Sequence, residues 1–137
     1  MKKFLLLLVV AVTSAFTYFA EAATSESELK AAIKLIDNEL PMRIDDDLVW
    51  QSASYSGNYV TFTFKFDENE ITADQLDSVK SMMKEAMVQA LFSDPNSRDM
   101  LKMLTALNKG LTLNFIGSRS GKKVPISITP SELKKLL

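Results

Sequence analysis

The spacing of apolar residues along the chain predicts four helices. Three segments start with a capping box, in which a hydroxyl residue is followed three positions later by Glu or Gln. These pairs are Ser25 with Glu28, Thr72 with Gln75, and Thr129 with Glu132. Apolar residues recur at helical spacing after each pair, so we expect helices over 25–40, 72–92 and 129–137. Asp94 caps a further, shorter helix, with Gly110 where its C-terminal cap belongs.

Between the helices, alternating apolar and polar residues predict two β-hairpins. Strands over 48–55 and 59–66 are joined by a short Gly-containing turn. Apolar residues also alternate over 111–115 and 124–128, which predicts the second hairpin. Pro125 cannot donate a ladder hydrogen bond, so the last strand is expected at a sheet edge or at a bulge.

The predicted order of elements is therefore α-β-β-α-α-β-β-α. Two hairpins can form one four-stranded antiparallel sheet, and amphipathic helices can cover its apolar face. We expect an α+β domain of this architecture. The pattern leaves the order of the strands within the sheet open.

The first residues have the pattern of a secretory signal. Lys2 and Lys3 precede a short apolar stretch, and Ala20-Glu21-Ala22 forms an A-x-A cleavage site. We expect residues 1–22 to be removed, which leaves one soluble periplasmic or secreted domain over 23–137. An uncleaved anchor that tethers the protein to the membrane is the alternative, because the uncharged stretch approaches the length of a membrane span.

Composition excludes several kinds of chemistry. The chain contains no cysteine and no histidine. These two absences exclude disulfides and the Cys-His and Ser-His-Asp nucleophile systems. They also exclude thiolate or imidazole sites for zinc or haem. We expect no cofactor and no catalytic residue, so the protein is predicted not to be an enzyme.

Charge is unevenly distributed along the chain. Residues 23–77 contain 12 acidic and 4 basic residues, whereas residues 109–137 contain 6 basic residues and 1 acidic residue. Either these segments neutralise one another in the fold, or the molecule is dipolar and docks onto a charged partner. The basic part lacks the interleaved aromatic residues of a nucleic-acid-binding surface, so we expect no nucleic-acid ligand.

Three adjacent aspartates, Asp45, Asp46 and Asp47, precede the first predicted strand. In an extended segment Asp45 and Asp47 share a side, which makes them the candidate metal ligands or catalytic carboxylates. A small hydrolase that uses these carboxylates or a metal is the alternative function. The spacing does not match a calcium-binding loop, so the acids are interpreted as a solvated strand entry.

Two groups of residues are candidates for contacts with a partner. Trp50 and Tyr55 lie on opposite faces of the first predicted strand by parity, so one of them is expected beside Tyr59 on the open face of the sheet. The second group is a predicted hairpin tip that could bind a phosphate, a lipid head group or an acidic partner. It comprises Arg119, Lys122 and Lys123.

Five methionines fall on the two central predicted helices. They are Met82, Met83, Met87, Met100 and Met103. A flexible core is the favoured interpretation, with a docking surface or a copper site as alternatives. Ser-x-x-Lys, a pattern of Ser-Lys hydrolases, occurs three times, which shows how common it is by chance.

The segments IDNELP, VWQSASYSGNYVTFTF and SGKKVPISITPSEL together resemble a group of small exported bacterial proteins without an assigned activity. The resemblance covers about residues 33–133. Members of the group often have a cysteine before the proline where this chain has Leu40, so no thiol role is carried over. The resemblance implies the α+β fold and export.

These features together predict a non-catalytic binding module of the cell envelope. We expect its partner to be another envelope or secreted protein, or an apolar or sugar ligand. Membrane contact is expected only through the signal segment before cleavage, and the sequence leaves the oligomeric state open.

Overall fold

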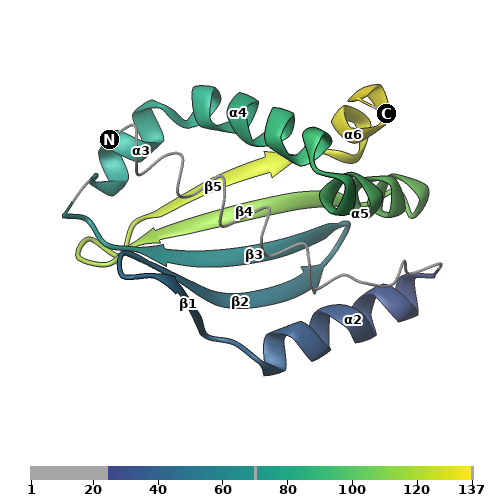
Figure 1. Cartoon of the computed structure of the whole chain (residues 1–137), viewed down its shortest axis with the longest axis horizontal. Helices are drawn as coiled ribbons and strands as arrows, with labels where there is room; N and C mark the ends of the chain where they lie inside the picture. The colour runs from purple at the N-terminus through teal and green to yellow at the C-terminus, as the bar shows by residue number, and fades with distance from the viewer. Residues whose placement is uncertain (1–24, 70, 137) are drawn as a thin grey trace.

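The computed structural model describes residues 25–69 and 71–136, and the predicted signal segment 1–22 lies outside them. Helices and strands form an α+β arrangement, in which β1 to β3 follow α2 and three consecutive helices separate β3 from β4 and β5 (Figure 1). The helices in this part are α2 (Glu26–Asn38), α3 (Ala73–Ser78), α4 (Lys80–Ser93), α5 (Pro95–Ala106) and α6 (Pro130–Leu136). The strands are β1 (Met42–Asp45), β2 (Leu48–Ser56), β3 (Tyr59–Phe66), β4 (Gly110–Gly117) and β5 (Lys123–Ile128).

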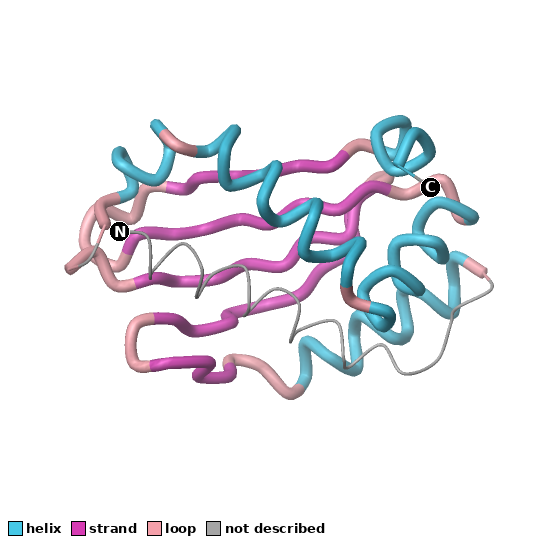
Figure 2. The backbone as a smooth tube through the Cα atoms, turned by 45° about the horizontal axis from the view of Figure 1, so that its top comes forward, coloured by secondary structure: helices cyan, strands magenta, loops and turns pink. Residues whose placement is uncertain are grey.

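The sheet differs from the predicted one in strand number and in direction. It has five strands in the order β1-β2-β3-β4-β5, and β3 pairs with β4 in parallel. Figure 2 shows the reason: after β3 the chain passes through α3, α4 and α5 before it enters β4. This long crossover returns the chain to the end of the sheet where β3 began, and parallel pairing requires such a return. Both predicted hairpins form, β2 with β3 and β4 with β5, but the prediction that they make a purely antiparallel four-stranded sheet was wrong.

The strand β1 was missed because it is short, directly follows Pro41 and ends in Asp45, the first of the three aspartates. Its four residues alternate between half-buried and exposed positions. Met42, Arg43 and Asp45 pair with β2, and the register shifts between Arg43 and Asp45. At the opposite edge lies β5, which contains Pro125. The edge position predicted for Pro125 is thus confirmed.

One face of the sheet is buried by helices. Helix α2 packs on β2, helices α3 and α4 pack on β5, and helices α5 and α6 pack on β4. In Figure 1, α2 and α4 border opposite sides of the sheet and α5 crosses one end of the strands. The alternating residues of β3 face the helices as predicted, and all are fully buried: Val60, Phe62, Phe64 and Phe66. Phe64 lies between Trp50 and Phe115, with ring centroids 6.1 and 5.5 Å away.

The methionines mostly belong to this core. Met83, Met87, Met100 and Met103 are buried, whereas Met82 is 57% exposed on the outer side of α4. Packing therefore explains four of the five methionines, as predicted by the interpretation of these residues as a flexible core. Within the described ranges no cluster of three or more His, Cys, Asp or Glu residues could hold a metal ion.

Side-chain caps define most helix starts as predicted. Complete capping boxes form at α3 and α6. The Ser25 hydroxyl accepts the amide of Glu28 at 3.2 Å, and the Asp94 carboxylate accepts the amide of Ser97 at 2.9 Å. The predicted helix over 72–92 is divided into α3 and α4 at Val79.

The C-terminal cap of α5 differs from the prediction. Asn108, with φ of 58°, takes the left-handed conformation, while Gly110 is the first residue of β4. The amides of Asn108 and Lys109 donate to the carbonyls of Thr105 and Leu104, at 3.0 and 2.8 Å. These two bonds form a Schellman motif. Gly110 is needed for another reason, because the ring of Tyr59 and the carbonyl of Ile128 occupy the space of a side chain there.

We expect Asn108→Ala to lower the free energy of unfolding by about 1 kcal/mol, because alanine tolerates the left-handed conformation poorly. Asn108→Gly should leave the stability unchanged or raise it slightly. Urea denaturation of both variants measures the difference, and equal stabilities would contradict this account of the cap.

Candidate functional site

The side of the sheet opposite the helices carries three rows of side chains that run across the strands. The strand register aligns them, and their members are half-buried or exposed. The first row is Ser54, Thr61, Thr112 and Ser127; the second is Ser52, Thr63, Asn114 and Pro125. The third is Arg43, Val49, Lys65, Ile116 and Lys123. We call these rows together the open face.

The third row alternates cationic and aliphatic side chains. Adjacent strands are about 4.8 Å apart, so Arg43, Lys65 and Lys123 follow one another at intervals of about 10 Å. Arg43 pairs with exposed Asp46 at 3.4 Å. Lys65 and Lys123 make no ion pair with residues 25–69 or 71–136. The row can therefore contact carboxylates and apolar groups of a partner together.

The other two rows supply hydroxyl and amide groups. Thr112 and Ser127 hydrogen-bond to each other through their hydroxyls at 2.9 Å. The side-chain oxygen of Asn114 is buried and has no hydrogen-bond partner in the described part of the chain. Its cross-strand neighbour Pro125 has no amide hydrogen to donate. A buried acceptor without a partner costs about 1–3 kcal/mol, which a donor from a bound molecule or water would recover.

Of the three aromatic candidates, Tyr59 alone lies on the open face. The register of β2 shifts between Trp50 and Ser52, which marks a β-bulge at Gln51. Because a bulge adds one residue, Trp50 and Tyr55 both pair with core-facing positions of β3, and the prediction of opposite faces was wrong. Trp50 is fully buried and cannot contact a partner.

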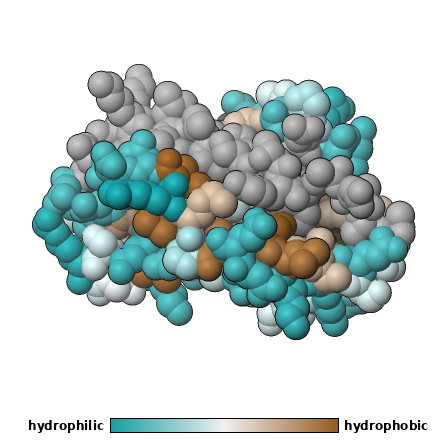
Figure 3. All heavy atoms as spheres, turned by 60° about the horizontal axis from the view of Figure 1, so that its bottom comes forward, coloured by the Kyte–Doolittle hydropathy of each residue, from teal (hydrophilic) through white to brown (hydrophobic). Residues whose placement is uncertain are grey.

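Tyr55 belongs to a cluster that attaches α2 to the sheet. Its hydroxyl donates to the Glu26 carboxylate at 2.8 Å, and the ammonium groups of Lys30 and Lys109 lie 5.3 and 5.4 Å from the centre of its ring. The hydrogen bond from Tyr55 and the charge of Lys109 lower the pKa of Glu26. Near the other end of α2, the Asp37 carboxylate accepts the amide of Ala53 at 3.0 Å. Figure 3 views the molecule from the α2 and β1 side, where hydrophilic side chains surround smaller apolar areas.

The hairpin tip between β4 and β5 encloses a carboxylate of the chain itself. Glu68, only 8% exposed, accepts the amides of Arg119 and Ser120 at 2.8 and 2.7 Å and the Ser120 hydroxyl at 3.2 Å. It also accepts the amide of Ala73, the first residue of α3, at 2.9 Å. Gly117 permits this approach, because the carboxylate occupies the space of a side chain at that position. The backbone donors that could hold an external anion are thus already occupied.

These hydrogen bonds determine the ionisation of Glu68. The donated amides of Ser120 and Ala73 lower the pKa of Glu68 from 4.5 to about 2, because they stabilise the charged form. The carboxylate therefore stays ionised and links the segment after β3 to the tip between β4 and β5.

The basic side chains of the tip have separate surroundings. Arg119 hydrogen-bonds to Asn69, and Lys122 pairs with Asp74, which raises the pKa of Lys122. Lys109 forms a second such ion pair, with the Glu26 carboxylate at 3.8 Å. The basic C-terminal segment therefore neutralises part of the acidic N-terminal one. Of the predicted tip residues, Lys123 alone belongs to the open face.

The aspartates do not form a cluster with other ligands. Asp45 ends β1 and is exposed, while Asp46 and Asp47 form the turn into β2. The backbone carbonyl of Asp47 accepts the amide of Asp67 at 2.8 Å. This arrangement fits a solvated strand entry, and within the described residues the aspartates belong to no group of three or more carboxylates that could hold a metal ion.

A shallow groove of about 350 Å³ lies between α4 and α6, with apolar Val88 and Leu136 among its lining residues. Ser81 and Lys84 also line it and form one of the Ser-x-x-Lys patterns. The Lys84 ammonium pairs with the Glu132 carboxylate at 2.8 Å, and this contact lowers the pKa of Glu132.

Comparison with known proteins identifies the fold alone. No family model and no curated protein matches the sequence. A candidate secreted protein from Pseudomonas aeruginosa is similar in structure, with a TM-score of 0.59 and 14% identity over 82% of this chain and 99% of that one. The type 2 secretion pilotin EpsS of Vibrio vulnificus has a TM-score of 0.56 and 15% identity, over 79% of this chain and 90% of that one. The type II secretion pilotin AspS of Vibrio cholerae has a TM-score of 0.51 and 16% identity, over 78% of this chain and 90% of that one.

The chain therefore has the α+β fold of small proteins that include secretion-system pilotins. No helix within the described residues is long and apolar enough to cross a membrane.

Glu68→Gln should lower the free energy of unfolding at pH 7 by about 2–3 kcal/mol, because it removes the charge that four donors satisfy. Chemical denaturation measures the loss, and the same exchange at exposed Glu85 is the control. A loss no larger than the control's would contradict the role of this carboxylate.

The pH dependence gives a second test of Glu68. Because its folded-state pKa is lowered from 4.5 to about 2, the stabilisation is fully present above pH 4.5 and is lost as the pH falls towards 2. The stability difference between the natural protein and Glu68→Gln should therefore shrink over that interval. Urea titrations at several pH values measure it, and a constant difference would contradict the assignment.

Proposed function

We propose that the chain is an exported, non-catalytic protein that binds another envelope or secreted protein through its open face. The observation that carries the proposal is the row of Arg43, Val49, Lys65, Ile116 and Lys123 on the side of the sheet opposite the helices. The signal pattern over 1–22 supports export. Two pilotins of type II secretion systems share the fold, which supports a role in the envelope.

The partner is expected to present acidic and apolar side chains side by side. Carboxylates would pair with the cations of the row, and apolar groups would cover Val49 and Ile116 between them. The hydroxyl rows beside them accept and donate hydrogen bonds at the rim of such an interface. A sugar ligand would use the hydroxyl rows and Tyr59 but leave the aliphatic positions uncovered, so we favour a protein.

The size of the face sets the expected strength of binding. Five strands about 4.8 Å apart, with rows about 6.7 Å apart, define an area of roughly 400 Å². Interfaces this small belong to weak and transient complexes. The complex should therefore dissociate during purification, so we choose covalent capture in cells as the test.

A photo-crosslinking residue placed at exposed Pro125, on the open face, should give one discrete protein adduct in the envelope of the native host. The same residue at exposed Gln89, on α4, is the matched control. Lys65→Glu combined with Lys123→Glu should abolish the adduct, because both charges then repel an acidic partner. Adducts that are equal at both positions, or unaffected by the double change, would refute the proposal.

The intact mass of the exported product tests the processing. Cleavage after Ala22 predicts a chain that begins at Ala23. A mass that includes residues 1–22, together with membrane fractionation, would instead favour the tethered form.

A further inference from the structure

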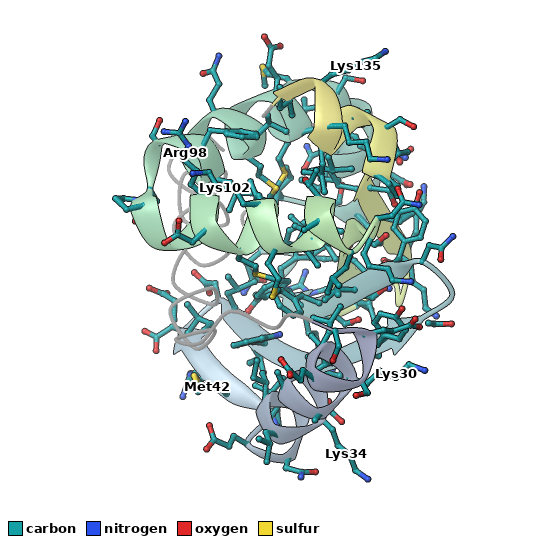
Figure 4. All side chains as sticks on the ribbon, turned by 90° about the vertical axis from the view of Figure 1, so that its right-hand side faces the viewer. Lys30, Lys34, Met42, Arg98, Lys102 and Lys135 are labelled. Carbon is teal, nitrogen blue, oxygen red and sulfur yellow. The ribbon has the colours of Figure 1, made fainter. Side chains whose placement is uncertain are left out.

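One end of the molecule carries cations on three helices. Figure 4 views this end and labels Lys30 and Lys34 on α2, Arg98 and Lys102 on α5, and Lys135 on α6. Figure 1 shows the same end at its right-hand side, where α2 begins and where α5 and α6 lie. We call these five residues the basic end. None of them belongs to the rows of the open face, although Lys30 and Lys34 line one crevice together with Ser54 of the first row.

Most of these cations have no acidic partner. Lys34, Arg98, Lys102 and Lys135 make no ion pair among the residues that the structure describes, and Lys30 pairs with Glu26 at 3.8 Å.

The acids on the same helices are mostly engaged. Glu26 also binds Tyr55 and Lys109, and Glu132 of α6 pairs with Lys84. Asp99 of α5 is exposed beside Arg98, and Glu28 is exposed on the first turn of α2. Helices α2, α5 and α6 together carry six basic and five acidic residues, and one of these acids, Asp37, lies near the opposite end of α2, where it accepts the amide of Ala53. The excess of positive charge at the basic end is therefore small and local.

The positions of the cations along the helices are unfavourable for the isolated protein. Lys30 and Lys34 are four residues apart on α2, as are Arg98 and Lys102 on α5. Like charges at this spacing lie on one helix face and repel each other. Nearby negative charge from outside the molecule would remove this repulsion.

The arrangement fits an extended anionic surface better than a small anion. The cations do not converge on a common cavity: Lys30 and Lys34 line a crevice of about 240 Å³ between α2 and β2, whereas Lys135 lines the groove between α4 and α6. Next to Lys135, Leu136 is 46% exposed. Basic side chains with an exposed leucine among them are typical of surfaces that contact bilayers of anionic lipids.

The position at which α2 begins also favours a lipid surface. Helix α2 begins at Glu26, only a few residues after the predicted export signal 1–22. While that signal is in the bilayer, the start of α2 and the end of the molecule around it are held close to the membrane. We propose that the basic end docks reversibly on an anionic lipid surface, independently of the partner bound by the open face.

Co-sedimentation of the exported product with lipid vesicles tests the proposal, after its mass has established whether residues 1–22 are present. The protein should bind vesicles that contain phosphatidylglycerol at low salt, bind phosphatidylcholine vesicles weakly, and dissociate as the salt concentration rises. Arg98→Gln combined with Lys102→Gln should weaken binding roughly 25-fold, about fivefold for each cation removed.

The matched control is Lys65→Gln with Lys123→Gln, which removes the same net charge from the open face. This control should bind the anionic vesicles as the unchanged protein does, and thermal melting checks that both variants are folded. If both double variants lose vesicle binding equally, the binding depends on net charge alone, and the proposal is overturned. Absence of binding, or equal binding to neutral vesicles, would also overturn it.

Two further outcomes separate this proposal from the proposed function. If vesicles are not bound but Arg98→Gln with Lys102→Gln abolishes the crosslink from Pro125, the basic end binds an acidic protein instead. If vesicle binding behaves as expected while the crosslink is absent, the lipid site stands and the open-face proposal fails.

Discussion

The structure depends on the burial of one face of β3. Val60, Phe62, Phe64 and Phe66 present four large apolar side chains on the same side of this central strand, and all are inaccessible to solvent. Removing such side chains from water contributes about 1.5–3 kcal/mol each, which makes this face the main reason for the helices to gather on one side. The opposite side of the sheet then remains partly exposed, and its cross-strand rows are a consequence of that one-sided cover.

Polar contacts hold the segments that this burial brings together. Glu68 links the residues after β3 to the tip between β4 and β5, and it does so with backbone amides rather than with basic side chains. Glu26 and Asp37 attach α2 to the sheet near the two ends of that helix. An acidic N-terminal half and a basic C-terminal half are therefore partly neutralised inside the molecule. Most of the cations without an acidic partner in the described part of the chain lie on the open face and at the basic end, which is why these two surfaces are the candidates for binding.

Local signals in the sequence predicted much of the fold. The capping boxes at Thr72 and Thr129 and the alternation in β3 were read correctly, because each depends on residues that are close in the chain. The candidate site was predicted less well. Tyr59 and Lys123 are on the open face, but Trp50 is in the core, and the cation row was not anticipated. A row of residues from five strands is a property of register, which parity within one strand cannot reveal.

The sequence by itself determined most of the helix and strand segments, the buried side of β3, and the absence of thiol and imidazole chemistry, because these follow from residue type and short spacing. The tertiary structure alone decided the parallel pairing of β3 with β4, the bulge that turns Tyr55 towards the helices, and the occupation of the hairpin tip by Glu68. Each of these joins residues far apart in the chain or shifts the register between strands. The energy that selects them comes from packing and hydrogen bonds that exist only after the chain has folded.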